Sequence, residues 1–450
     1  MMRISSAARR FAKIQPCQMK FMATLVATEE FPIPASLTPK AVKADVITAS
    51  TLANGVKIIS KDTANSALVS IKVVVSGGSG YESVSEKGSA HMLSVAAFSG
   101  HTKKSGLRLM RDLENMGASV SSSADREKIT FSLSVMKENV TEAFHTFAEA
   151  ICSPPTGAHV IKERIPAAQI AYDEKASSPQ LMLSEMLHES MYGETSPLGA
   201  SLFASKLEKL SYSDMIGYKS KIFKSGNTSV VASGLSHTSL QALVEGSLSL
   251  SSGVVDAPEC PYVGGETKIR ADLGTTHAAL AFPVSGADAD KVSAVIACVL
   301  KARLAAASAN GYTASAFSSS YTSTSATGVY VCDHPTRIGA NLQLAANELR
   351  AIAKGDAAAQ VELAKSQLGL VAAMGLEGDA TDALVTAALS GKTVAAIVDY
   401  SSVDAKQVAS AAAAMLSATP SYALLGVTAG APTYATVSSL AKAPGVVPAL

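Results

Sequence analysis

Residues 76–101 read SGGSGYESVSEKGSAHMLSVAAFSGH, and the interpretation of the whole chain starts from them. A β-rich run, Ser70–Val75, stops where this stretch begins with its glycines. A polar loop follows over residues 81–88, and after it comes a short apolar segment around His91. A β-branched run, then glycines, then an apolar segment indicate a strand, a tight loop and a helix.

The helical part of this stretch carries half of a zinc motif. Gly88, Ala90, His91, Phe98 and Gly100 match the pattern of the pitrilysin/insulinase metallopeptidases, whose helix contains His-x-x-Glu-His, and the segment resembles that family. Residues i and i+4 lie on one helix face, so two histidines at that spacing hold one zinc ion. The glutamate between them takes a proton from the zinc-bound water.

The two decisive positions of the motif differ in this chain. Ser94 stands where the family has the glutamate, and Val95 stands where it has the second histidine. Serine is no base near neutral pH, valine offers no lone pair, and catalytic zinc is usually held by three protein ligands. The frame of a metallopeptidase is therefore predicted without its chemistry, and His91 is expected to be a helix histidine that donates one hydrogen bond.

Other stretches offer poor replacements for the missing ligands. His188-Glu189 starts like the order His-Glu-x-x-His, but the closing position is Tyr192. The family's third ligand is a glutamate on a downstream helix, and residues 163–174 lie in about the right region. The acids there are expected to be solvated helix charges: Glu163, Asp173 and Glu174. We predict no catalytic, metal-ligating or cofactor-binding residue, and no cofactor.

Length and composition indicate a multidomain protein without a nucleic-acid partner. The 450 residues exceed one ordinary domain, and the 38 basic and 37 acidic residues nearly balance. No uninterrupted apolar run reaches the roughly 18 residues that a membrane-spanning helix needs. Five scattered cysteines lack metal-binding or redox spacing, so reduced structural thiols are expected: Cys17, Cys152, Cys260, Cys298 and Cys332.

The N-terminus differs from the rest of the chain. Residues 1–27 contain five basic residues, two serines and no acid, and the first acid is Glu29. Such a segment is typical of a mitochondrial transit peptide. A disordered basic tail is the alternative.

The remainder is predicted to be two α+β halves with a repeated order of elements. An Asn54-Gly55 turn marks the first hairpin, and the strand ending at Val75 has a counterpart ending at Val284. In each half, strands pair locally and helices cluster on one side. The expected domains are residues 45–247 and 263–450, joined by a Ser/Gly/Pro-rich linker over residues 248–262. Two homologous α/β-sandwich domains facing each other, in a pseudo-two-fold repeat, are what the family resemblance implies.

The resemblance to the family is most specific in four segments: residues 52–56, residues 76–82, residues 187–199, and residues 262–280. The last of these segments, together with Asn227 and residues 231–237, is most similar to the second core subunits of mitochondrial ubiquinol–cytochrome c reductase, complex III. This resemblance implies a non-catalytic scaffold that lies peripherally on the matrix side of the inner membrane in a dimeric complex. The implied partners are core subunit 1, cytochrome b, cytochrome c1 and the Rieske protein.

Two departures separate the chain from related functions. Active members have a Leu-Arg-Glu element after an Arg-Leu pair, whereas Arg303-Leu304 is followed here by alanines. Nothing between residues 300 and 330 resembles the glycine-rich loop of non-catalytic processing-peptidase subunits. A presequence-recognising, alpha-type subunit of the mitochondrial processing peptidase is the alternative function, and a self-sufficient zinc peptidase is disfavoured.

Overall fold

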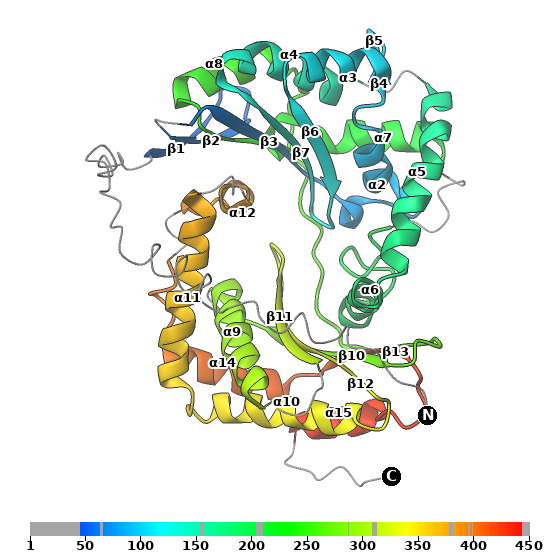
Figure 1. The fold of residues 1–450 in the computed structure, drawn as a ribbon, viewed down its shortest axis with the longest axis vertical. Helices are drawn as coiled ribbons and strands as arrows, with labels where there is room; N and C mark the ends of the chain where they lie inside the picture. The colour runs from blue at the N-terminus through cyan, green and yellow to red at the C-terminus, as the bar shows by residue number, and fades with distance from the viewer. Residues whose placement is uncertain are drawn as a thin grey trace, which may run out of the picture. The chain divides into compact units, whose positions relative to one another are not determined.

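The computed structural model describes most of the chain after the leader (Figure 1). The described residues are 46–63, 66–153, 157–203, 210–286, 288–307, 313–377, 382–394, 397 and 399–442. The predicted transit peptide, residues 1–27, lies outside them. Residues 45–450 form one compact unit. Among the described residues, no helix is both long enough and apolar enough to cross a membrane.

The N-terminal half contains a six-stranded sheet in the order β1-β2-β8-β3-β7-β6. Only β2 and β8 are parallel, and every other neighbouring pair is antiparallel. The strands are β1 (Val46–Thr51), β2 (Lys57–Asp62), β3 (Leu68–Ser76), β6 (Ser119–Ala124), β7 (Lys128–Met136) and β8 (Thr228–Ser233).

The predicted first hairpin is confirmed. Strands β1 and β2 pair antiparallel, and Gly55 at their turn has a φ of +95°, a conformation that favours glycine. The side chain of Asn54 accepts a hydrogen bond from the Val56 amide at 3.0 Å and so fixes the turn.

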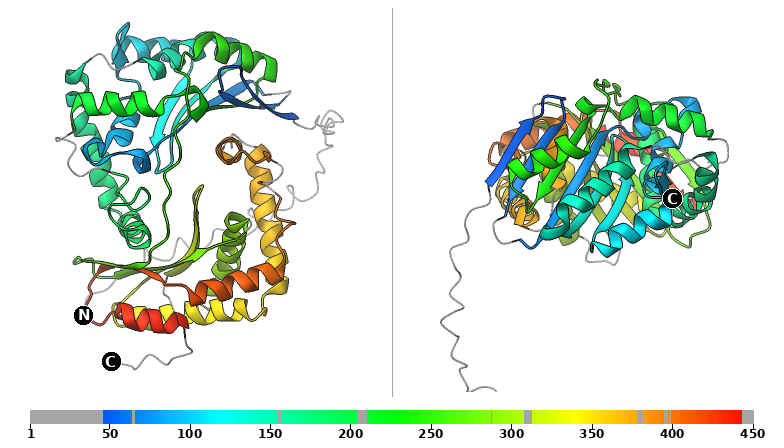
Figure 2. Two further views of the ribbon diagram at one scale, coloured as in Figure 1. Left: turned by 180° about the vertical axis from the view of Figure 1, so that it is seen from behind. Right: turned by 90° about the horizontal axis from the view of Figure 1, so that it is seen from above.

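One face of this sheet is covered by helices, as the alternating pattern of β7 predicts. Every second residue of β7 is buried, from Ile129 to Val135. Helices α4 (Val140–Cys152) and α8 (His237–Ser247) lie together over this face (Figures 1 and 2). Further described helices of this half are α2 (Ser89–Ala96), α3 (Gly106–Asn115), α5 (Ala158–Ala176) and α7 (Tyr212–Ile222).

The C-terminal half repeats this arrangement. Its sheet has the order β11-β12-β10-β13-β9, and β13 and β9 are its parallel pair. The orders coincide when β6, β7, β3, β8 and β2 are matched to these five strands, so the predicted repeat is confirmed; β1 has no counterpart among the described residues. The strands are β9 (Gly265–Arg270), β10 (Thr276–Val284), β11 (Thr313–Ser320), β12 (Ser325–Asp333) and β13 (Ser421–Gly426).

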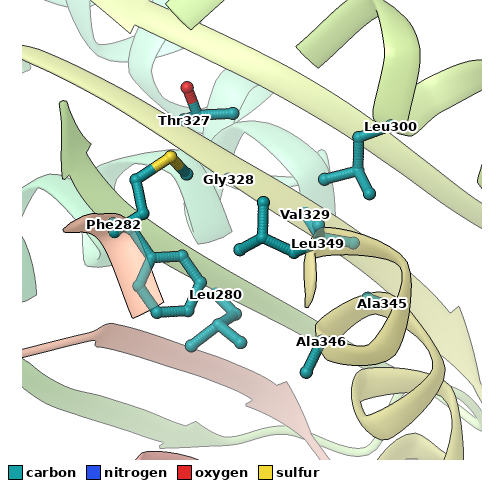
Figure 3. A pocket seen from close by; sticks show the side chains of 10 residues that line it. Leu280, Phe282, Leu300, Thr327, Gly328, Val329, Ala345, Ala346 and Leu349 are labelled. Atoms are coloured by element: carbon teal, nitrogen blue, oxygen red, sulfur yellow. The ribbon is translucent and has the colours of Figure 1, made fainter. Parts of the chain in front are cut away.

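The core of this half lies between its sheet and helices α9 (Ala289–Ala307), α10 (Ile338–Ala353) and α14 (Ala405–Ser417). The last described helix is α15 (Tyr434–Lys442). Apolar side chains of β10, β12, α9 and α10 surround a gap of about 10 Å³, and Figure 3 shows these side chains. This volume holds one water molecule at most, so the gap is a packing defect rather than a ligand site.

The second face of each sheet is covered by a helix from the other half. Helix α6 (Pro179–Tyr192) packs on alanines of the C-terminal sheet, including Ala279 and Ala423. Helix α12 (Asp382–Ser390) follows α11 (Ala358–Glu377) and packs on Ile59, Val74 and Val231 of the N-terminal sheet. The prediction that helices cluster on one side of each sheet is therefore incomplete. The exact linker boundaries, 248–262, stay a prediction.

We expect Leu384→Ala to lower the free energy of unfolding by about 2–5 kcal/mol, because Leu384 is fully buried against the N-terminal sheet. Amide exchange should accelerate in β3 and β8, although the substitution lies in the other half. The matched control is Leu363→Ala on α11, where the side chain is 58% exposed, with an expected change within about 0.5 kcal/mol. Equal changes in the free energy of unfolding for the two substitutions would contradict the packing of α12 on the N-terminal sheet.

Candidate functional site

The loop after β3 is fixed by close backbone contacts. A Cβ on Gly78 would lie 2.2 Å from the carbonyl oxygen of Asp125, so only glycine fits there. The Gly80 amide donates to the Arg126 carbonyl at 2.9 Å, and the buried Tyr218 hydroxyl donates to the Gly78 carbonyl at 2.8 Å. The glycines of the diagnostic stretch therefore place helix α2 against the turn between β6 and β7.

The N-terminus of α2 is capped by a carboxylate from this loop. Glu82 accepts hydrogen bonds from the amides of Gly88 at 2.8 Å and Ala90 at 2.7 Å. Negative charge is favourable at this end of a helix. Burial nevertheless raises the pKa of Glu82 to about 7, and the two backbone hydrogen bonds only partly oppose that shift.

His91 is a buried, neutral side chain on α2. Its ring makes an edge-to-face contact with Phe203, with ring centroids 5.1 Å apart. Burial and the nearby Lys175 ammonium lower the pKa of His91 to about 4. Its Nδ1 atom is buried and has no hydrogen-bond partner among the described residues. The single hydrogen bond expected of this ring stays a prediction.

The positions of the missing base and ligand are filled by structural contacts. The Ser94 hydroxyl donates to the His91 carbonyl at 2.7 Å, one turn back along α2. The Ser94 carbonyl accepts from Ser122 on β6 at 2.6 Å. Val95 is half-buried and packs against the core of the N-terminal half. Neither side chain offers an atom to a metal at His91.

Helix α5, which contacts α2, contributes a cation rather than a third ligand. Lys175 places its ammonium 3.7 Å from the centre of the Phe203 ring, the same ring that contacts His91. The three acids considered in this region are exposed, as expected for helix-face charges: Glu163, Asp173 and Glu174.

These residues do not fit a zinc ion, because a lone histidine faces a fixed positive charge. In the described part of the chain, no group of three or more His, Cys, Asp or Glu side chains could hold a metal. That the chain has no catalytic, metal or cofactor residue stays a prediction.

His188 joins the two halves. Its Nδ1 lies 2.7 Å from the Ser184 carbonyl within α6, and its Nε2 lies 2.8 Å from the Tyr321 hydroxyl at the turn between β11 and β12. The hydroxyls of Tyr192 and Thr324 are 3.0 Å apart beside this contact. The sequence analysis considered His188 only as a broken zinc motif and missed this role, because Tyr321 is distant in sequence.

A cavity of about 790 Å³ lies beside this junction. Its walls include Glu127, Lys128 and the hydroxyl-rich turn over residues 320–325. Glu127 accepts hydrogen bonds from both the amide and the hydroxyl of Thr322. The amide nitrogen lies 3.0 and 3.1 Å from the two carboxylate oxygens, and the hydroxyl oxygen lies 3.0 Å from one of them. Burial raises the pKa of Glu127. The cavity therefore presents hydroxyls, the Glu127 carboxylate held by Thr322, and further charged side chains: Asp125, Lys128, Asp288, Asp290 and Lys392.

Glu82 should make stability depend on pH. Its pKa is about 7 in the folded chain and close to 4.5 when unfolded, so the folded state binds the proton more tightly. Between these values, the folding free energy becomes less favourable as pH rises. Glu82→Gln should remove that part of the pH dependence, measured by urea unfolding from pH 4.5 to 8. The exposed Glu163→Gln is the control, and identical pH profiles for Glu82→Gln and the parent would refute the assignment.

Comparisons of the sequence with known protein families and individual proteins identify relatives of this chain. The model of the insulinase family, peptidase family M16, matches residues 57–206, and that of the peptidase M16 inactive domain matches residues 209–368. A probable mitochondrial-processing peptidase subunit alpha-1 from Arabidopsis thaliana is 29% identical over 73% of this chain and 70% of its own length. The mitochondrial-processing peptidase subunit beta of Bos taurus is 25% identical over 73% and 72%.

A solved structure confirms the fold over a longer span. A chain of complex III2 from Candida albicans, with Inz-5 bound, superposes with a TM-score of 0.76 at 16% identity. The match covers 88% of this chain and all of that one. The helix that corresponds to the family's zinc helix is altered at two positions, Ser94 and Val95. Because models of two M16-type domains match in succession, the chain belongs to the insulinase family, peptidase family M16, and its second domain is of the family's inactive type.

Proposed function

We propose that this protein is a non-catalytic structural core subunit of mitochondrial respiratory complex III, of the second-core-subunit type. The observation that carries the proposal is the altered zinc helix on an intact two-domain frame. Ser94 and Val95 replace base and ligand, and Lys175 sits with Phe203 beside the remaining histidine. Such a chain keeps the surfaces of a peptidase without the means to cleave a peptide bond.

The structural similarity to a complex III chain, over 88% of this chain and all of that chain, supports this proposal. The proposed partners are core subunit 1, cytochrome b, cytochrome c1 and the Rieske protein, in a dimeric complex. The proposed place is the matrix side of the mitochondrial inner membrane, held there through the complex. A subunit in such an assembly buries large apolar surfaces, often above about 2,000 Å² in total.

The alternative is a non-catalytic, presequence-recognising alpha subunit of the mitochondrial processing peptidase. The observation that favours it is the similarity to plant alpha subunits, which includes a Solanum tuberosum protein 31% identical over 53% of this chain and 47% of that protein. Detergent-solubilised membranes separated on a native gel distinguish the two functions. Co-migration with cytochrome b and ubiquinol–cytochrome c reductase activity supports the core subunit; recovery in a soluble two-chain peptidase supports the alternative.

The purified chain is expected to hold no stoichiometric zinc, because His91 has no partner ligand on α2 and its surroundings favour a neutral, metal-free ring. Metal analysis after gentle dialysis measures this, with His91→Ala as the matched variant. One tightly held zinc per chain that disappears in His91→Ala would overturn the expectation.

Complementation of a null strain should distinguish a scaffold function from a processing function. In a null strain, loss of the protein should remove assembled complex III and its reductase activity, whereas the His91→Ala variant should restore both. The physical reason is that His91 contributes only local packing within the N-terminal half. Normal assembly with accumulation of uncut import precursors in His91→Ala cells would instead favour the processing function.

A further inference from the structure

A second cluster of reactive side chains lies on the C-terminal sheet, away from the altered zinc helix. Cys332 on β12 and His277 on β10 are register partners, and the Cys332 sulfur is 4.0 Å from His277 Nε2. The other ring nitrogen, Nδ1, is 2.7 Å from the Tyr330 hydroxyl. Tyr330 and Cys332 are two residues apart on one strand, so both side chains project from the same face.

The tautomer of His277 that carries its proton on Nδ1 is compatible with the surrounding contacts. The Thr275 hydroxyl lies 3.4 Å from Nε2, and both this hydroxyl and the Cys332 thiol can donate toward that nitrogen. In this tautomer Nε2 is the acceptor, and Nδ1 donates its proton to the Tyr330 oxygen. The Tyr330 hydroxyl also bonds Gln180, in the first turn of α6. Burial lowers the pKa of His277, which keeps the ring neutral.

This arrangement has the three parts of an activated thiol. A nucleophile faces the Nε2 lone pair of an imidazole, and a third group fixes the orientation of that imidazole. The sulfur–nitrogen distance is long for a hydrogen bond, as is common before a reagent is bound. Cys332 is half-buried, so a small reagent can reach its sulfur whereas a bulky one is hindered.

We propose that Cys332, His277 and Tyr330 form an oxidant-sensitive thiol site that small peroxides convert to a sulfenic acid. His277 takes the thiol proton, and the sulfur attacks one peroxide oxygen. The oxygen–oxygen bond breaks, the sulfur is oxidised by two electrons, and the peroxide is reduced. The imidazolium returns its proton to the departing hydroxide, so hydrogen peroxide and the thiol give a sulfenic acid and water. Tyr330 is a positioning residue, since it orients His277, and its hydroxyl also contacts the Cys332 thiol directly.

The test treats the reduced full chain with equimolar hydrogen peroxide in the presence of dimedone, and quantifies the adduct at each cysteine by peptide mass spectrometry. Cys298 is the matched control because it is also half-buried, with its sulfur 3.5 Å from the Gln367 side-chain oxygen instead of an imidazole. Burial raises the pKa of the Cys298 thiol. Cys332 should be labelled about tenfold faster than Cys298.

His277→Gln should remove most of that advantage, and Tyr330→Phe should reduce it about threefold, while Cys298 labelling and the melting temperature stay unchanged. If His277→Gln does not fold, Tyr330→Phe decides, because it deletes only a hydroxyl. Equal labelling of Cys332 and Cys298 in the parent chain, or an unchanged Cys332 rate in the folded variants, would overturn the proposal.

Discussion

Each sheet of this protein depends on a helix that the other half supplies. Four alanines of the C-terminal sheet let α6 approach closely: Ala279, Ala281, Ala326 and Ala423. On the N-terminal sheet, α12 covers Ile59, Val74 and Val231, and Lys72 pairs with Asp382 at 2.7 Å. Without these helices, both sheets would expose apolar residues to water, so neither half is complete by itself. The contacts of His188 and Glu127 lie at the same junction and depend on this exchange.

Contacts of the protein's own residues hold helix α2 in place. Its position follows from glycines that admit close backbone contact, and from Glu82, which caps the helix N-terminus. The contacts around His91 involve an aromatic ring and an ammonium, which stabilise one another through the negative face of the Phe203 ring. This packing explains how a metallopeptidase frame persists after its base and second ligand have been replaced.

The sequence predicted correctly those structural features that depend on neighbouring residues. The Asn54-Gly55 turn and the alternation along β7 need only neighbouring residues, and the repeated strand order follows from two copies of such patterns. The replacement of the zinc motif's glutamate and second histidine by Ser94 and Val95 could also be predicted to matter, because positions i and i+4 share a helix face. The packing of α6 and α12 on the opposite sheets and the role of His188 could not be predicted, since both depend on residues that are far apart in the sequence. Cys332 and His277 likewise meet only through strand register.

The exchange of α6 and α12 has a consequence for biosynthesis. A ribosome completes all six strands of the N-terminal sheet by Ser233, yet the helix that covers Ile59, Val74 and Val231 begins at Asp382. During that interval the nascent chain carries a finished sheet with one apolar face uncovered, which is a condition that favours aggregation. Contacts of such long sequence separation also slow folding. Truncation before residue 382 should therefore leave an N-terminal half whose sheet exposes this apolar face and favours aggregation.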